Sequence, residues 1–292
     1  MAAIKGVAVN VSSGDNGDEL SDGKGGGLGY IDVGFPSSHP LVTSIGGTSL
    51  ALNADASVKF QTGWGTTGMR LTDGVTTPDL AVANQNPALD PPTKIGFVGG
   101  SGGGTSRLFP KPDFQAHLNG SGRMIPDISY LADPYTGVVL VESSFDDKGN
   151  PQPGTLVTQT IGGTSLACPM FSGVWAIAAQ ANGGPLGQAA PLLYNLPAGA
   201  IIDMLPVSST TNVTGSVTDA KGTTTFNVLS LGLPQTLAPF YSALYNSPHT
   251  PYRWDVLSFG ADSTLQITVG WDNVTGLGVP NGVQFIQQFI KQ

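Results

Sequence analysis

The chain has 292 residues, of which 40% are apolar, enough for one large domain or two small ones with a sizeable core. Only 11% of the residues are charged, with 12 basic against 20 acidic side chains and a formal net charge of -8. No window clusters Lys and Arg, which argues against a nucleic-acid-binding protein, and no apolar run is long enough to span a membrane. In acid, such a surface loses its negative charge and keeps few cations to repel one another, which fits an acidic medium.

The first expected element is a buried strand at residues 6–11, Gly-Val-Ala-Val-Asn-Val, almost at the start of the chain. Buried parallel strands need neighbours on both sides, so two interpretations are open. Either the chain simply starts with a strand, or a preceding segment has been removed or lies on another chain. A turn dense in Gly and Asp follows at residues 12–17, then a short strand at 42–45 and a flexible, Gly-rich surface loop at 99–104.

Residues 137–142 and 156–161 resemble paired strands joined by a polar turn at 146–151. Residues 169–181 are apolar nearly all round, which predicts a buried helix with its proline in the first turn. A shorter helix is expected at 188–196.

Residues 197–252 are rich in Ser, Thr and Gly, with a β-like alternation that persists to Val228. They form a small β insertion or a poorly ordered loop, and the alternation favours β structure. Strands that alternate with helices predict a mainly parallel α/β sheet flanked by helices. We therefore expect one domain over residues 1–292, incomplete at its N-terminus, with an insertion at 197–252.

The candidate nucleophile is Ser165, which lies between a β-like run and the predicted buried helix. A hydroxyl at that place lies near unpaired backbone N–H groups, which can stabilise an oxyanion. The alternative is an ordinary helix N-cap, which Ser or Thr often supplies. The same five letters, Gly-Gly-Thr-Ser-Leu, also occur at residues 46–50, so this motif alone is weak. No buried helix follows Ser49, which is therefore expected to be structural.

Gly-Thr-Ser-x-x-x-Pro before a buried helix is shared by subtilisins and sedolisins. A subtilisin needs a histidine in a His-Gly-Thr setting to accept the serine proton, and His39, His117 and His249 have other settings. The chain resembles the sedolisins, or serine-carboxyl peptidases, over most of its length. Five further segments carry this resemblance in the family's order: Ser12-Ser-Gly-Asp-Asn-Gly17, Phe35-Pro-Ser-Ser-His-Pro40 with Val42-Thr-Ser-Ile-Gly-Gly-Thr48, Gly102-Gly-Gly-Thr-Ser106, Arg123-Met-Ile-Pro-Asp-Ile-Ser129 and Gly270-Trp-Asp-Asn-Val-Thr-Gly276.

The resemblance implies a subtilisin-like α/β fold and an endopeptidase that acts on proteins or peptides at acid pH. Ser165 would be the nucleophile, and Asp15, in its protonated form, would stabilise the oxyanion beside the Ser165 N–H. In the family, a glutamate one helical turn from an aspartate acts as general base, well upstream of the Ser-Ser-Gly-Asp turn. Only eleven residues precede that turn here, and adjacent Asp18 and Glu19 cannot share a helix face. We expect an N-terminal fragment of the same precursor to supply the base.

The resemblance also implies a Ca²⁺ site near the C-terminus, where carboxylates and backbone carbonyls provide hard oxygen ligands. Its predicted ligands are Asp255, Val256, Thr268, Gly270 and Asp272. The alternative is a surface turn with ordinary Asp caps. The short loop between the two aspartates and the long insertion before Asp255 depart from the family's pattern.

Two functional hypotheses follow. The first is a secreted peptidase, or one of an acidic compartment, which is inactive as this chain alone and carries calcium. The second is a non-catalytic sedolisin-like module, or inactive fragment, that binds protein or carbohydrate after loss of the Glu/Asp pair. The substrate preference cannot be inferred from these residues.

Overall fold

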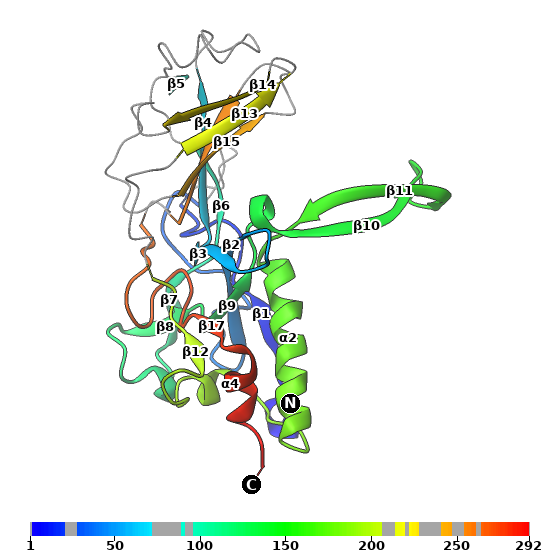
Figure 1. Ribbon diagram of the computed structural model, residues 1–292. Coiled ribbons are helices and arrows are strands. Elements are labelled where there is room, and N and C mark those ends of the chain that lie inside the picture. Colours follow the sequence, from blue (N-terminus) through cyan, green and yellow to red (C-terminus); the bar gives the residue numbers. More distant parts are fainter. Residues whose placement is uncertain are drawn as a thin grey trace.

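The structure is a computed structural model that describes residues 2–20, 28–71, 89–90, 96–205, 214–219, 222–227, 241–246, 254–260 and 264–291 (Figure 1). Its central sheet is built around β2, to which β1 and β9 pair in parallel and β3 pairs antiparallel. Ile45 of β2 pairs with Ser12 on one side and Ile128 on the other, so β1 and β9 lie on opposite edges of β2. The bounds of these strands are β1 Asn10–Ser12, β2 Thr43–Leu52, β3 Val58–Gly63 and β9 Ile128–Leu131.

Helix α2 (Thr164–Ala181) packs against this sheet and against α4 (Gly282–Gln287). Its aromatic side chains meet those of the C-terminal helix: Trp175 lies edge-on to Phe289, with ring centroids 5.1 Å apart. Together with Ile45 and Ile128 these rings form the buried core under α2. This core therefore holds α2, whose second residue is the candidate nucleophile, in place against the sheet.

The helix begins five residues earlier than predicted, so Pro169 lies inside it rather than in its first turn. Pro169 has no N–H to donate to the carbonyl of Ser165, one turn before it. The expected second helix is also shorter, a single turn at α3 (Ala190–Leu193).

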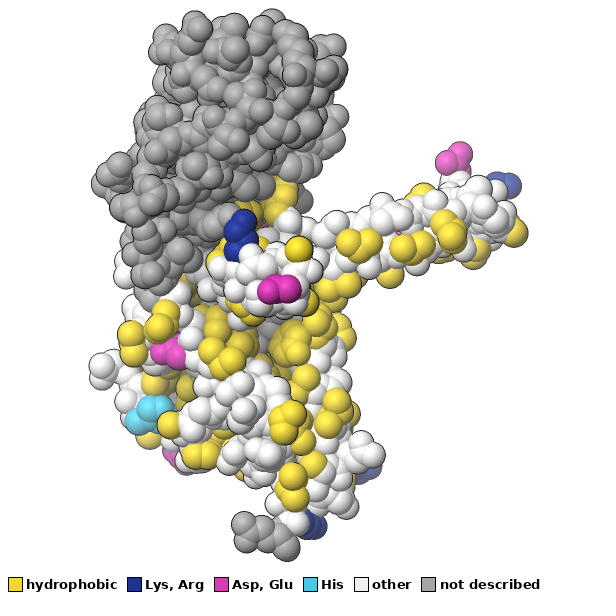
Figure 2. Space-filling model, in the orientation of Figure 1, with side chains coloured by type: hydrophobic (Ala, Val, Ile, Leu, Met, Phe, Trp, Pro, Cys, Tyr) yellow, Lys and Arg dark blue, Asp and Glu magenta, His cyan; other side chains and the backbone are white. Residues whose placement is uncertain are grey.

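The predicted pair of strands is confirmed as a long hairpin, β10 (Val138–Phe145) and β11 (Pro151–Ile161). It projects away from the sheet and ends at the start of α2 (Figure 1). Apolar side chains line this ribbon in the open, as Figure 2 shows, including Val139 at 62% and Leu156 at 72% exposure. This exposed β ribbon thus leads directly into the turn before Ser165, the candidate nucleophile.

Two further sequence expectations were wrong. Residues 99–104 are not a flexible surface loop, because Ser101, Gly102 and Gly103 are buried. A Cβ added to Gly102 or Gly103 would overlap the backbone of Ser13 or Asn273, so these glycines serve close backbone packing. The first strand is also shorter than residues 6–11, since β1 starts at Asn10 after a 3₁₀ turn, η1, at Ala3–Lys5.

A buried ion pair joins β8 to the residue that precedes β9. Arg123 and Asp127 are both fully buried, with Nη2 2.5 Å from Oδ2. Asp127 also accepts the Ser44 N–H of β2 at 2.8 Å and the Tyr194 hydroxyl of the α3 region at 3.1 Å. These contacts of Arg123 and Asp127 therefore hold the backbone in place directly before β9.

The remaining strands form a second sheet, whose described pairing order is β15-β16-β4-β5 with β6 beside β4, and three two-stranded pairs, β7 with β8, β12 with β17 and β13 with β14. Three of these strands, β13, β14 and β15, lie within residues 214–246, inside the segment expected to be a β insertion. The limits of that insertion stay a prediction. Two 3₁₀ turns complete the described elements. The bounds are β4 Gly65–Leu71, β5 Leu89–Asp90, β6 Gly96–Gly100, β7 Gly104–Pro110, η3 Asp113–Gln115, β8 Gly122–Ile125, η4 Pro134–Thr136, β12 Ile201–Ile202, β13 Thr214–Asp219, β14 Gly222–Asn227, β15 Tyr241–Asn246, β16 Trp254–Phe259 and β17 Val279–Pro280.

Candidate active site

The turn before the nucleophile is built from two glycines between β11 and α2. Gly163 has φ +88°, a conformation that L side chains rarely adopt, and its N–H donates to the Ala132 carbonyl at 2.5 Å. A Cβ at this position would lie 2.8 Å from Oδ2 of Asp15. Glycine therefore lets the chain leave the ribbon, enter the helix and keep a carboxylate in contact with the turn.

Asp15 follows β1, at the carboxyl end of a parallel strand, where α/β proteins commonly place their sites. Its Oδ1 accepts the backbone N–H of Thr164 at 2.7 Å and the Thr164 hydroxyl at 2.8 Å. The carboxylate thus caps the positive end of α2. The structure brings Asp15 to the residue beside Ser165, and Oδ2 is left facing the glycine turn.

Ser165 is the second residue of α2, and its side chain is exposed. Within the described residues, no hydrogen bond involves its hydroxyl, and its backbone N–H also has no partner. A free N–H at a helix N-terminus beside a carboxyl group can bind a developing oxyanion. The described part of the chain thus places an exposed hydroxyl and a free N–H beside a carboxyl group, an arrangement that could serve a nucleophile and an oxyanion site.

The carboxylates that follow Asp15 in the sequence, those of Asp18 and Glu19, make local hydrogen bonds and are not placed to act as a base for Ser165. Asp18 is buried, and its carboxylate accepts the Leu20 N–H at 2.9 Å and the Thr264 hydroxyl at 2.6 Å. Glu19 accepts from the Asn16 side chain at 3.3 Å, within its own loop. Both groups therefore serve the loop that carries Asp15, and in the described structure no hydrogen bond joins either one to Ser165.

The duplicate serine has a different environment. Ser49 lies inside β2, fully buried, and its hydroxyl donates to Oδ2 of Asp133 at 2.7 Å. Because the Ser49 side chain has no access to solvent, it can only be structural, as expected.

Asp133 is a residue that the sequence interpretation missed. It is fully buried and accepts the Thr66 hydroxyl at 2.8 Å and the Tyr135 N–H at 2.9 Å, besides Ser49. Burial raises the pKa of this carboxyl group, against the lowering effect of its hydrogen bonds. The preceding carbonyl, of Ala132, holds the Gly163 N–H, so Asp133 anchors the segment under the nucleophile turn. The only sequence signal was an Asp-Pro pair that follows the Arg123–Ser129 segment.

Three of the five predicted calcium ligands lie together in one loop. Thr268 and Gly270 are exposed, whereas Asp272 is buried and accepts the N–H groups of Val274 at 2.8 Å and Thr275 at 2.7 Å. Burial raises the pKa of Asp272 to about 6. A carboxylate that is desolvated in this way is stabilised in its charged form by a nearby cation.

A second carboxylate reaches this loop from a part of the chain that the sequence interpretation did not single out. Asp203, directly after β12, accepts the Gly270 N–H on Oδ2 at 2.7 Å. Its Oδ1 is buried and has no hydrogen-bond partner. A buried oxygen without a partner is costly, and a hard cation would satisfy it. The donor set around residues 268–272 therefore fits Ca²⁺ with Asp203 included.

The other two predicted ligands, Asp255 and Val256, belong to β16, where they pair with Tyr245 and Leu244 of β15. Their side chains lie outside the described residues, so their role stays a prediction. No group of three or more His, Cys, Asp or Glu side chains that could hold a metal occurs in the part of the chain described. In the same part, no helix is long and apolar enough to cross a membrane.

The chain is thus an α/β protein in which a strand–turn–helix presents Ser165 beside the Asp15 carboxyl group. A scan against models of known protein families gives no match. Kumamolisin of Bacillus sp. (strain MN-32) is 34% identical over 205 residues, which cover 67% of this chain and 29% of that protein. Sedolisin of Pseudomonas sp. (strain 101) is 32% identical over 198 residues, covering 66% of this chain and 27% of that protein.

The chain belongs to the sedolisin family of peptidases. It spans less than a third of the length of these relatives. A solved structure of Pseudomonas sedolisin, described as a serine-carboxyl proteinase complexed with two molecules of pseudo-iodotyrostatin, matches 98% of this chain with a TM-score of 0.59 at 23% identity. The match covers 56% of that chain. The predicted subtilisin-like fold, with its mainly parallel central sheet, is thereby confirmed.

Proposed function

We propose that this chain is the nucleophile-bearing part of a serine-carboxyl endopeptidase that cleaves protein or peptide substrates at acid pH. The observation that carries the proposal is the pair of hydrogen bonds from Thr164 to Asp15, which holds a carboxyl group against the helix end where Ser165 lies exposed. A structural cap alone would not require an exposed serine with a free N–H beside it.

In the proposed reaction, the Ser165 hydroxyl attacks the scissile carbonyl carbon, and its proton passes to a general base. The carbonyl oxygen becomes an oxyanion that accepts hydrogen bonds from the Ser165 N–H and from protonated Oδ2 of Asp15. The base then protonates the leaving amine, and water repeats the sequence on the acyl-enzyme. This role uses the protonated carboxyl group of Asp15 as a hydrogen-bond donor.

The general base is proposed to come from a Glu/Asp pair on an N-terminal fragment of the same precursor. Support comes from the local hydrogen bonds of Asp18 and Glu19 and from the 56% coverage of the sedolisin chain. A secreted or acidic location is proposed with it, because carboxylates that lie close together share protons and titrate as a coupled pair.

We also propose a Ca²⁺ ion at residues 268–272, held by Asp203, Asp272 and the carbonyls of Thr268 and Gly270. A bound Ca²⁺ ion would place positive charge beside these carboxylates. The orphaned Oδ1 of Asp203 supports the addition of Asp203 to the predicted ligands, and the roles of Asp255 and Val256 stay a prediction.

The test is cleavage of a denatured protein and of a peptide library between pH 3 and pH 7, by material that contains the remaining precursor segments. Ser165→Ala should abolish turnover without loss of thermal stability, since this side chain is exposed and makes no hydrogen bond in the described structure. Ser121→Ala, at another exposed serine, is the matched control and should cleave normally. Unchanged cleavage by Ser165→Ala would exclude the mechanism. Absence of cleavage by the wild type at every pH would favour the non-catalytic binding module.

A further inference from the structure

The ribbon formed by β10 and β11 is apolar on both of its faces and is exposed along its length. Val139 and Leu156 belong to one face, and Val138 belongs to the other. An isolated two-stranded ribbon is only marginally stable in water, and exposed apolar patches usually mark a binding surface. Both observations indicate that the ribbon binds a further element.

The two strands of the ribbon carry almost no charge. Glu142 is the only charged side chain within them, and its Oε1 accepts a hydrogen bond from Gln159 at 2.5 Å. The other charges of the hairpin lie in the turn at its tip, residues 146–148. A partner that matches the strands is therefore apolar rather than charged.

Strand β11 offers a free edge on the part nearer to α2. Among the described strands it pairs only with β10. In the regular ladder of Leu156–Ile161 with Val138–Ser143, every second residue directs its N–H and C=O away from the partner strand. Closer to the tip the register shifts, and Pro151 and Pro153 have no N–H to donate. The open edge is therefore Leu156–Ile161, about 20 Å long.

This edge and the candidate nucleophile belong to one connected unit. Three residues separate Ile161 from Ser165. A Cβ at Gly137 would lie 2.0 Å from the Ile161 carbonyl oxygen, so the start of β10 is packed closely against the end of β11. In the turn that follows, the Gly163 N–H donates to the Ala132 carbonyl. A polypeptide that pairs with β11 is thereby led to the Ser165 hydroxyl.

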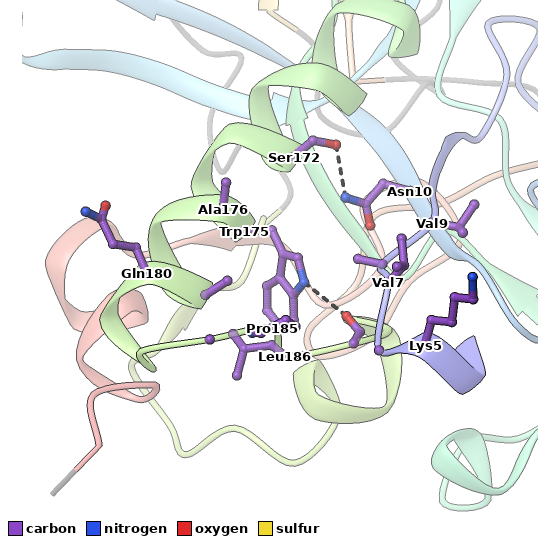
Figure 3. Close-up of a pocket in the computed structure, with 15 residues that line it drawn as sticks. Lys5, Val7, Val9, Asn10, Ser172, Trp175, Ala176, Gln180, Pro185 and Leu186 are labelled. Atoms are coloured by element: carbon purple, nitrogen blue, oxygen red, sulfur yellow. Dashed lines mark hydrogen bonds between the residues drawn. The ribbon is translucent and has the colours of Figure 1, made fainter. Parts of the chain in front are cut away.

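The groove beside α2 is less suited to this role. It has a volume of about 830 Å³ and lies between Val9, directly before β1, and Trp175 of α2 (Figure 3). Trp175 is ten residues further along the helix than Ser165, which corresponds to about 15 Å. A peptide held between these two side chains has no continuous strand edge that leads to the hydroxyl.

We propose that the free edge of Leu156–Ile161 binds the substrate segment on the carboxyl side of the scissile bond, as an added antiparallel strand. Antiparallel pairing is favoured because parallel sheets are buried on both faces, whereas this ribbon is exposed. Since β11 runs toward Ser165, an antiparallel strand runs away from it and consists of the residues that follow the scissile bond. The occupant is an extended, uncharged segment rich in β-branched residues, because a strand edge pairs with another backbone. The role of Ser165 in this inference rests on the proposed function.

The first experiment measures binding, with the Ser165→Ala form of material that contains the remaining precursor segments. The probe is a peptide of six alternating Val and Thr residues with a lysine at its carboxyl end for solubility. Its control carries N-methyl groups on three consecutive central amides, which prevent pairing in either register and leave the side chains unchanged. We expect the control to bind at least tenfold more weakly.

A protein variant tests the same surface. Leu156 is 72% exposed, so Leu156→Ser should keep its thermal stability and bind the probe at least threefold more weakly. Leu108→Ser, at a 77% exposed position of β7, is the matched control and should bind like the parent. Direction is tested with a photoreactive group: at the amino end of the probe it should label residues near Ile161, and at the carboxyl end residues near Leu156.

Four results would each overturn the inference: no binding of the probe, equal binding of the methylated control, parent-like binding by Leu156→Ser, or labelling in the reverse direction. Protection of the outward amides of Leu156–Ile161 from hydrogen exchange before the probe is added would also overturn it, because another segment or a second copy then occupies the edge. Since none of these readouts depends on catalysis, a failure here is distinct from a failure of the Ser165 mechanism.

Discussion

Removal of the Asp15 carboxylate should destabilise the chain by about 2 kcal/mol, because Asp15 caps the N-terminus of α2. Asp15→Ala leaves the Thr164 N–H without an acceptor in a residue that is 1% exposed. Loss of an N-cap typically costs about 1 kcal/mol, and the cost rises to about 2 kcal/mol when the N–H group left without an acceptor is buried. The Thr164 hydroxyl does not add to this cost, since it can turn to the Gly14 carbonyl at 3.1 Å.

Chemical denaturation of this chain measures the effect without any substrate or partner. Asp15→Asn is the matched control: it keeps Oδ1 as an acceptor, so its loss should stay below about 1 kcal/mol. In a Thr164→Val background, which lacks the hydroxyl, the effect of Asp15→Ala should stay about the same, because the Thr164 N–H that carries the cost is still present. If Asp15→Ala unfolds at the same denaturant concentration as the wild type, the carboxylate is not docked on α2 and the proposed oxyanion site fails.

Three further predictions concern the groups around the site. Arg123→Met should cost about 3–5 kcal/mol in denaturation, because it leaves the buried charge of Asp127 unpaired, whereas replacing both residues by apolar ones should cost much less. Burial raises the pKa of Asp133 above its ordinary value of 3.8, so the neutral form is favoured on folding. Its contribution to the free energy of unfolding is therefore present at lower pH and is lost as pH rises through the raised pKa; Asp133→Asn should flatten that pH dependence. A chelator should remove about 2–3 kcal/mol from a chain held at one hundred times its calcium Kd, and this effect should vanish in Asp203→Asn. If it vanishes in Asp255→Asn and persists in Asp203→Asn, the original ligand prediction is the correct one.

Much of the fold could be predicted because local patterns and the tertiary fold agree. The hairpin at residues 138–161 has an alternating strand pattern and a polar turn, both visible in the sequence. In the structure, Asp146 of this turn accepts the Asn150 N–H at 2.8 Å. The sequence could link Asp15 to Ser165 only through the family resemblance. The hydrogen bond that brings their segments together joins Asp15 to Thr164, which lies 149 residues further along the chain. Nothing local to either residue predicts that they meet.

The failures have tertiary causes. The glycines at 99–104 were expected in an exposed loop because glycine suits turns, but here they allow backbone segments to approach closely. Asp203 was missed because its partner, Gly270, is 67 residues away, and no spacing rule connects them. Helix α2 was expected to be buried on all sides, and the structure covers only one side of it.

The two copies of Gly-Gly-Thr-Ser-Leu show how structural context, rather than the motif, separates the proposed nucleophile from a buried serine. In β2 the glycines at 46 and 47 are extended, and added Cβ atoms would strike side chains of neighbouring segments, so they are needed for packing under Trp64 and its neighbours. Before α2, Gly163 has a positive φ instead and ends the ribbon in a sharp turn. The first arrangement buries Ser49 in the sheet, whereas the second exposes Ser165 at a helix N-terminus. Because an attacking hydroxyl needs both access and a nearby positive dipole, only the second copy can do chemistry.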